Sequence, residues 1–354
     1  MKKAFFLAII FAITIALLAN GCKPAAAPTQ PAAGSANGPT VYTAGNYSPD
    51  GSNNIACYWK GTTKTDLQCS GINAGATGIN VIGGTIYTSG YDYESGNSVP
   101  CYWVGTAQTN LPDSESTNGS ASSIDVSGGT IYTAGYYYYS HYDIPCYWTG
   151  TTKTDLPGLG AYTAQAQSIY IYGGQVYTAG YANNGSYNVP CYWTGTSMTE
   201  LNGSVNGSAY SINVAGGVVY TAGFYNNGST DVACYWTGTT ETDLPGNTYG
   251  AQACSINVIN GTIYIAGYYA NNTYFIPCYW TVTSVGTIRN DLTGSGISGN
   301  GYATSIFATG GTVYTGGYYD NSGSNDVPCY WAGITENNLQ ATTYNAIVNA
   351  ICVQ

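Results

Sequence analysis

The stretch IPCYW at residues 144–148 decides the fold, because its last three residues recur seven times along the chain. Consecutive copies are 43 to 51 residues apart, and they begin at Cys57, Cys101, Cys146, Cys191, Cys234, Cys278 and Cys329. Self-similarity at a period of about 20–50 residues indicates a repeat architecture in which each repeat is one supersecondary unit. The sequence therefore predicts seven equivalent units.

Each unit contains four short β-rich runs. Its members are a strand such as SINV (211–214), a strand such as TIYTAGY (130–136), a strand ending in CYW, and a short segment ending in Leu such as TDL (154–156). A Gly-Gly pair between the first two runs suits a two-residue hairpin, whose central residues need positive φ. Four strands per repeat, seven times over, predict an all-β, seven-bladed β-propeller of four-stranded blades. A linear β-solenoid is the structural alternative.

The two ends of the repeat region indicate how the ring closes. The first copy starts at VYTAG (41–45) and lacks its SINV strand, whereas AICV (350–353) occupies that register at the other end of the sequence. A C-terminal strand that pairs with the first blade removes two open sheet edges. We therefore expect the first blade to be completed by the C-terminal strand.

The repeats are similar to two known kinds. The doubled glycine after four strand residues resembles kelch-type repeats, although kelch units separate the Tyr from the Trp. The order YW, turn, DL resembles the repeats of bacterial surface lipoproteins of the β-propeller type. This resemblance covers residues 40–354. It implies the fold and a location at the cell surface, and it implies no activity.

The N-terminus has the pattern of an export signal. Lys2 and Lys3 precede the apolar run AFFLAIIFAITIALLA, and small residues follow. This predicts a signal peptide at 1–21, a Pro/Ala/Gly-rich tether at 22–39 and the propeller at 40–354. Gly21-Cys22 resembles the lipobox of bacterial lipoproteins, with Ala19 where that family usually has Leu. The resemblance implies lipidation of Cys22 and a lipid-anchored protein of the outer membrane or cell surface. A secreted or periplasmic protein is the alternative.

Charge limits the classes of partner. The chain has 7 basic and 17 acidic residues, a net charge of −10, and only 7% of its residues are charged. Such an acidic protein is not expected to bind nucleic acid through release of counterions. We expect contact with the membrane only through the lipid anchor, and we expect a monomer.

The Cys-Tyr-Trp motif is interpreted as packing. Side chains alternate across a strand, so Cys146 and Trp148 face one way and Tyr147 the other. Equivalent cysteines of neighbouring blades are expected to lie beyond the reach of a disulfide. Cys69, Cys254 and Cys352 lie outside the motif, and one pairing among them is left open. The predicted structural tryptophans are Trp59, Trp103, Trp148, Trp193, Trp236, Trp280 and Trp331.

Residues for catalysis or metal binding are scarce. His141 is the single histidine and lies in the predicted hairpin tip YYYYSHYD. The acids of the TDL segments recur in most blades, which favours hydrogen bonding at turns or strand ends. DNSGSND (320–326) resembles a calcium loop without its distal Glu. We therefore predict a non-enzymatic protein without cofactor or metal. The alternative is a polysaccharide hydrolase or lyase that uses Asp125, the one acid expected on the inner strands, in the central channel.

The tips between TIYTAGY and PCYW carry the functional prediction, because all seven should project from one rim. They are rich in Tyr, Asn, Ser and Gly, a mixture that binding paratopes use. We predict recognition of a glycan or a protein at this rim; a structural envelope protein without a dedicated ligand is the alternative. The candidate binding residues are Tyr91, Tyr93, Tyr136, Tyr137, Tyr138, Tyr139, His141, Tyr181, Asn183, Asn184, Tyr225, Asn226, Tyr268, Tyr269, Asn271, Tyr318 and Tyr319.

Overall fold

The structure is a computed structural model that describes residues 38–112, 118–201, 205–246, 248–292, 294, 297–321, 325–339 and 345–354. The predicted signal peptide, Cys22 and nearly all of the tether lie outside these residues. Within them, regular secondary structure consists of strands β1 to β28. No helix in the described part of the chain is long and apolar enough to cross a membrane.

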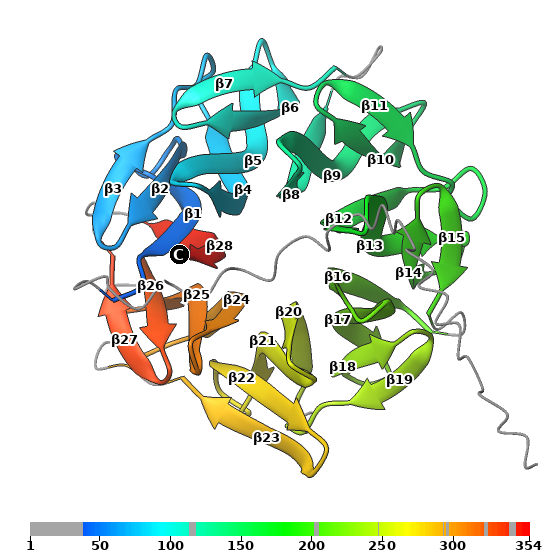
Figure 1. Ribbon diagram of the computed structural model, residues 1–354, viewed down its shortest axis with the longest axis vertical. Helices are drawn as coiled ribbons and strands as arrows, with labels where there is room; N and C mark the ends of the chain where they lie inside the picture. The colour runs from blue at the N-terminus through cyan, green and yellow to red at the C-terminus, as the bar shows by residue number, and fades with distance from the viewer. Residues whose placement is uncertain are drawn as a thin grey trace, which may run out of the picture.

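The strands form seven four-stranded antiparallel sheets arranged in a ring, as the sequence predicts (Figure 1). The innermost strands are β28 (Ala346–Val353), β4 (Ala74–Ile82), β8 (Gly119–Ser127), β12 (Ala164–Tyr172), β16 (Gly207–Ala215), β20 (Ala251–Ile259) and β24 (Gly301–Thr309). The second strands are β1 (Val41–Tyr47), β5 (Thr85–Glu94), β9 (Thr130–Tyr139), β13 (Gln175–Asn183), β17 (Val218–Asn226), β21 (Thr262–Ala270) and β25 (Thr312–Asp320).

Two further layers complete each blade toward the outside of the ring. The third strands are β2 (Ile55–Lys60), β6 (Asn97–Val104), β10 (Tyr142–Thr149), β14 (Asn188–Thr194), β18 (Asp231–Thr237), β22 (Phe275–Thr283) and β26 (Asp326–Ala332). The outer strands are β3 (Thr63–Asp66), β7 (Ala107–Asn110), β11 (Thr152–Asp155), β15 (Ser197–Glu200), β19 (Thr240–Asp243), β23 (Gly286–Asp291) and β27 (Thr335–Asn338).

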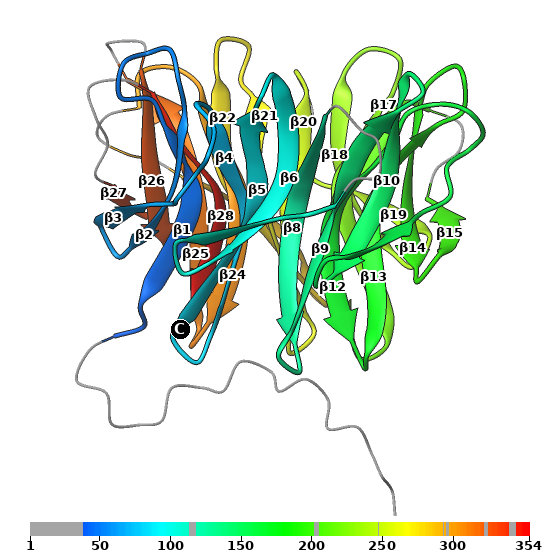
Figure 2. The same ribbon diagram turned by 90° about the horizontal axis from the view of Figure 1, so that it is seen from above.

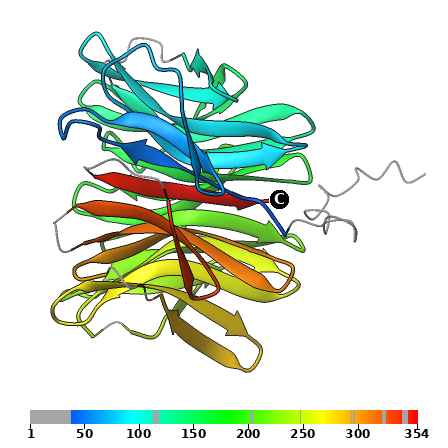
Figure 3. The ribbon, with the colours of Figure 1, turned by 90° about the vertical axis from the view of Figure 1, so that its left-hand side faces the viewer.

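The first blade is built from both ends of the described chain, which confirms the predicted closure. Strand β1 lies between β28 and β2, with Val41 opposite Val353 and Ala44 opposite Ala350. The two strands run side by side in Figure 3. Because β28 pairs with β1, β1 has a partner on each side and the first blade has four strands like the other six.

The Cys-Tyr-Trp motif packs as predicted. Cys146 and Trp148 are 0% exposed, and the same holds for their equivalents in the other blades. The indole N–H of Trp148 also donates to the backbone carbonyl of Pro112, in the connection from the preceding blade, at 3.1 Å. Trp193 makes the equivalent bond to Pro157 at 2.9 Å. A buried indole needs an acceptor, so each of these tryptophans also fastens a blade to its neighbour.

The hairpins divide the molecule into two faces (Figure 2). The first and second strands of a blade meet at the predicted Gly-Gly turns, for example Gly83 and Gly84, whose φ angles are +57° and +80°. Val41 and Val353 lie on this side, which we call the glycine face. The second and third strands meet at the Tyr/Asn-rich tips on the opposite side, which we call the tip face.

Candidate functional site

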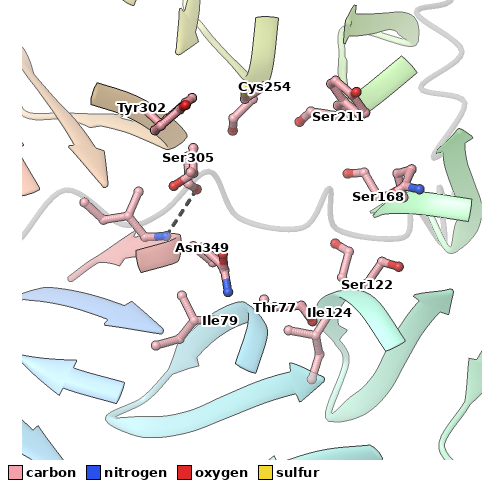
Figure 4. A pocket seen from close by; sticks show the side chains of 18 of the residues that line it. Thr77, Ile79, Ser122, Ile124, Ser168, Ser211, Cys254, Tyr302, Ser305 and Asn349 are labelled. Carbon is pink, nitrogen blue, oxygen red and sulfur yellow. Dashed lines mark hydrogen bonds between the residues drawn. The ribbon is translucent and has the colours of Figure 1, made fainter. Parts of the chain in front are cut away.

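Every inner strand carries a β-bulge at the same register. In β12, Ala166 and Ser168 face consecutive residues of β13, so Gln167 has no cross-strand partner. A bulge of this kind bends the strand and re-aims the extra side chain. The seven bulged residues, called the bulge ring below, are Thr77, Ser122, Gln167, Tyr210, Cys254, Thr304 and Asn349. All seven line one central cavity (Figure 4).

The central cavity has a volume of about 470 Å³, which is within the usual size range for small-molecule sites. Its walls come mainly from the inner strands, with Tyr268 and Tyr318 added from second strands. None of its described lining residues is Asp, Glu, Lys, Arg or His. The cavity is therefore polar but uncharged, and it opens within a ring of hydroxyls, amides and phenols.

One side of the cavity is aromatic. The tyrosine wall consists of Tyr210, Tyr268, Tyr302 and Tyr318, from the fifth, sixth and seventh blades. The ring of Tyr302 lies 5.0 Å from that of Tyr268 at 81°, and 5.0 Å from that of Tyr318 at 33°. Phe275 packs edge-on against Tyr268 at 5.1 Å. These are favourable aromatic geometries, so the wall is a fixed surface.

A hydrogen-bond chain holds the centre of the tyrosine wall. The hydroxyl of Tyr268 donates to Oε1 of Gln252 at 2.7 Å. The amide Nε2 of Gln252 donates in turn to Oδ2 of Asp231 at 2.8 Å. Burial is the main cause that raises the pKa of Tyr210, Tyr268 and Tyr318 above that of a free tyrosine. The wall thus presents neutral phenols at physiological pH.

The opposite side of the cavity is polar and tied to the backbone. Oγ1 of Thr77 donates to the carbonyl of Ala121 at 2.5 Å, and Nδ2 of Asn349 donates to the carbonyl of Ala76 at 2.8 Å. Each bond crosses from one blade to the next. These contacts fix the side chains of Asn349 and Thr77, from the first and second blades, across the cavity from Tyr302 (Figure 4).

The residue directly after each bulge in the sequence is usually a serine, whose hydroxyl connects neighbouring inner strands. The Oγ of Ser211 accepts the backbone N–H of Ile256 at 3.1 Å, and Ser168 accepts that of Ile212 at 3.3 Å. We call this series the serine ladder. Its members are Ser123, Ser168, Ser211, Ser255 and Ser305. The other two inner strands hold Gly78 and Ala350 at this register.

The predicted binding tyrosines separate into two sets according to their register. Those directly after the TIYTAG glycine are partly buried and include Tyr268 and Tyr318 of the tyrosine wall. Burial first, and nearby Asp143 second, raises the pKa of Tyr181 to about 12. The equivalents in the second, third and fourth blades are Tyr91, Tyr136 and Tyr181.

The second set points away from the channel and has structural partners. Tyr137 donates to Asp155 at 3.2 Å, and Tyr269 donates to Asp291 at 3.0 Å. Tyr225 and Tyr319 contact Asp243 and Asn338 in the same way. The acid of the TDL segment is thus an acceptor for the tyrosine of its own blade.

The predicted asparagines shape the tips. Oδ1 of Asn183 accepts the N–H of Gly185, and Oδ1 of Asn184 accepts the N–H of Ser186. Asn226 and Asn271 accept backbone N–H groups two residues ahead in the same manner. Such Asx turns set the loop conformation.

Four predicted residues are exposed on the tip face. Tyr93, Tyr138 and Tyr139 are 37–48% exposed, and His141 is exposed as well. His141 lies in a two-residue turn with Ser140, where both residues have positive φ, of +80° and +49°. The structure places these residues at the rim, and it does not bring them into the central cavity.

Sequence reasoning missed Gln252, Tyr302 and the whole bulge ring, Tyr210 included. The signal was present, because six of the inner strands read Ala, variable residue, then Ser or Gly just before the SINV-like apolar positions. The variable residue is the bulged one. Its position in the cavity depends on how the inner strand pairs with the second strand, and a comparison of the repeats in sequence does not reveal this pairing.

Asp125, the acid considered for catalysis, is held by hydrogen bonds. Oδ2 accepts the N–H of Ile171 at 2.8 Å, while Oδ1 accepts Nδ2 of Asn80 at 3.0 Å and the N–H of Val126 at 2.8 Å. Burial raises the pKa of its carboxyl, against the effect of the two backbone donors. It is not among the residues that line the cavity.

The other chemical candidates are dispersed. Among the described residues there is no group of three or more His, Cys, Asp or Glu suited to a metal ion. The segment 320–326 is described only in part; its Asp320 and Asp326 are cross-strand neighbours. The ten described cysteines are free thiols, Cys69, Cys254 and Cys352 included. Burial raises the pKa of Cys254, within the cavity, to about 12.

Comparisons with known proteins establish the architecture. No protein-family profile and no curated protein matches the sequence. Solved structures do: the β-propeller domain of the Trilobed protease from Pyrococcus furiosus has a TM-score of 0.52 at 8% identity, covering 87% of this chain and 96% of that one. An acylaminoacyl peptidase from Pyrococcus horikoshii has a TM-score of 0.51 at 9% identity, covering 85% of this chain.

The comparisons also mark a difference. This chain spans about half the length of the acylaminoacyl peptidase, at 50% of that chain. The Trilobed protease domain is described as having an open velcro topology, whereas here β28 pairs with β1. At identities of 8% and 9% the likeness is one of fold. The chain is therefore a seven-bladed β-propeller whose first blade joins both ends of the propeller sequence.

Proposed function

We propose that this protein is a non-enzymatic binding propeller that holds a neutral carbohydrate in its central cavity. The observation that carries the proposal is the tyrosine wall facing uncharged hydroxyl and amide groups across one cavity. Aromatic rings offer a flat apolar surface to the C–H face of a sugar, and the opposite groups suit its hydroxyls. Binding sites of this kind combine apolar walls with a few placed polar groups.

Charge supports a neutral ligand. The cavity has no cationic side chain among its described lining residues, and the chain has a net charge of −10. An anionic ligand would therefore meet an unfavourable field with no compensating ion pair. A neutral sugar loses little on leaving water if its hydroxyls find the amides and hydroxyls of the bulge ring.

The tips extend the proposed site outward. Tyr138 and Tyr139 and the turns around Asn184 and Asn271 lie on the tip face, where a longer glycan or its carrier protein would contact them. In a chain anchored to a membrane through Cys22, the tip face would point outward, because the propeller begins on the glycine face at Val41. Lipid anchoring and placement at the cell surface remain part of the proposal.

The non-enzymatic part of the proposal rests on the environment of Asp125. Its carboxylate accepts three hydrogen bonds and lies outside the lining of the cavity. A glycoside hydrolase usually needs a pair of carboxyl groups flanking the bond that is cleaved. The peptidases that share the fold are too distant in sequence, at 8–9% identity, to carry their activity to this chain.

The test is a glycan array followed by titration calorimetry with the best neutral oligosaccharide. Tyr302→Ala removes the centre of the tyrosine wall and is expected to reduce affinity at least tenfold. Tyr138→Ala with Tyr139→Ala tests the rim separately, and Tyr137→Phe is the matched control outside both. Loss in the rim variant alone would move the site to the tips. A folded protein that binds no saccharide would refute the proposal and support a structural envelope role.

A further inference from the structure

The serine ladder is incomplete at two neighbouring junctions of the ring. At five junctions, the N–H of an isoleucine on one inner strand donates to a serine of the preceding blade. At the remaining two junctions the serine position of the preceding blade holds another residue. This residue is Ala350 at the junction with Ile79, and Gly78 at the junction with Ile124. Neither Ala nor Gly has a hydroxyl to accept the bond.

The two backbone donors without a serine lie in the wall of the cavity. Ile79 and Ile124 both line it, and they occupy the same register as Ile169, whose N–H points to Ser123. Within the described part of the chain, no side chain is placed to accept either N–H. In Figure 4 both residues lie across the opening from Tyr302 and Cys254. Backbone N–H groups are strong donors that need a partner when removed from water.

The residues around Gly78 leave no room for a serine at this position. A Cβ at position 78 would lie 2.6 Å from Oγ of Ser89 and 3.1 Å from N of Ile124. Ser89 replaces the alanine found opposite the ladder serine in the next blade, where Ser123 faces Ala134. Its hydroxyl pairs with Oγ1 of Thr77 at 3.1 Å. The second blade therefore has its hydroxyl on the second strand, and the N–H of Ile124 has no serine acceptor at this junction of the cavity wall.

From these donors we infer that the ligand carries an uncharged carbonyl group, the acetamido group of an N-acetylhexosamine. The inference rests on the proposed function. The carbonyl oxygen, with two lone pairs, accepts from the N–H of Ile79, of Ile124 or of both, while the sugar ring lies on the tyrosine wall. A carboxylate or phosphate suits the site less, because no cation lines it and the protein is acidic.

The experiment compares N-acetylglucosamine with glucose, each as the monosaccharide and as the β-1,4-linked oligosaccharide. Titration calorimetry with the intact protein is expected to give at least about tenfold tighter binding for the acetamido sugar, the value of one or two net hydrogen bonds. Equal affinity for the two sugars would overturn the inference while leaving carbohydrate binding intact. Binding of neither sugar at any chain length would overturn the proposed function and the inference with it.

Two variants complete the ladder and so test the donors directly. Ala350→Ser adds only a hydroxyl, in the same setting as Ser168, since Ala44 faces position 350 as Ala179 faces 168. Gly78→Ser combined with Ser89→Ala gives the second blade the residues of the third. Each variant is expected to melt no lower than the wild type. Each should lose about tenfold in affinity for N-acetylglucosamine with little change for glucose.

The control variant lies outside the cavity. Tyr137→Phe removes a hydroxyl that donates to Asp155, and it should lower stability slightly without changing the preference between the two sugars. An undiminished preference in both folded ladder variants would refute the role of Ile79 and Ile124.

Discussion

The hydroxyl of Tyr137 donates to the carboxylate of Asp155 at 3.2 Å, and this contact gives a reason why a tyrosine and an acid recur together in the repeat. Nζ of Lys153 lies 3.4 Å from the centre of the same ring and 3.3 Å from the same carboxylate. Tyr47, Asp66 and Lys64 repeat the arrangement in the first blade. The tyrosine, the acid and the cation join the second strand of a blade to its outer strand.

Removing that hydroxyl should have a small structural effect and no effect on ligand binding. Tyr137→Phe keeps the buried ring and loses one hydrogen bond to a carboxylate that is half exposed, so we expect a loss of about 0.5–1.5 kcal/mol in unfolding free energy. Chemical denaturation measures this loss, and titration with the sugar measures binding. A large drop in affinity would place Tyr137 in the site after all.

Deletion of residues 346–354 should destabilise the propeller strongly. The deletion removes β28, exposes the edge of β1 and leaves the first blade with three strands. We expect a fall in melting temperature of about 10 °C or more, together with aggregation. Gln354→Ala, which loses only a bond to the carbonyl of Val81, is the mild control. A truncated protein as stable as the intact one would show that β28 contributes little to closure.

The seven motif cysteines should be inert in the folded protein. Their side chains are 0% exposed, and where a shift is resolved burial raises the thiol pKa well above its usual value. Iodoacetamide at pH 8, followed by peptide mass spectrometry, should modify Cys69 slowly and Cys146 only after unfolding. The pKa of Cys69 is raised to about 12, mainly by burial, so even this partly exposed thiol should react slowly. Rapid native labelling of Cys146 would contradict the packed structure.

Stability should fall as the pH rises through the titration of Asp326 in the seventh blade. Burial, then a hydrogen bond with Asp320, raises the pKa of Asp326 to about 6 from an ordinary 3.8. The folded protein therefore binds more protons than the unfolded chain between these values, and the stabilisation present below pH 4 is lost as the pH passes 6. Melting temperatures from pH 4 to 7 should show this slope.

Asp326→Asn should flatten the slope and stabilise the protein at pH 7 by on the order of 1 kcal/mol, a value reduced for the pair's exposure to solvent. Asp320→Asn should flatten the slope only in part, because it ends the repulsion between the two carboxylates and leaves Asp326 buried. A slope that survives both substitutions would have to come from other groups.

The architecture could be predicted because its causes repeat along the chain. Buried Cys146 and Trp148, the positive-φ glycines Gly83 and Gly84, and the displaced strand AICV each appear as a pattern in one dimension. The central cavity could not be predicted, because its lining depends on the register between strands. Tyr268 and Tyr269 are adjacent and chemically identical, yet one joins the tyrosine wall and the other contacts Asp291. Tyr302 and Asn349 reach the cavity from the inner strands and not from the tips.

The position of β1 between β28 and β2 has a mechanical consequence. A pulling force applied at Val41 acts along the length of this strand, so it loads two hydrogen-bond ladders in shear and must break many bonds at once. Force applied at the other terminus meets only the single ladder between β28 and β1. A propeller held through β1 is thus attached by a strand with two hydrogen-bond ladders, and traction on it would be shared between β28 and β2.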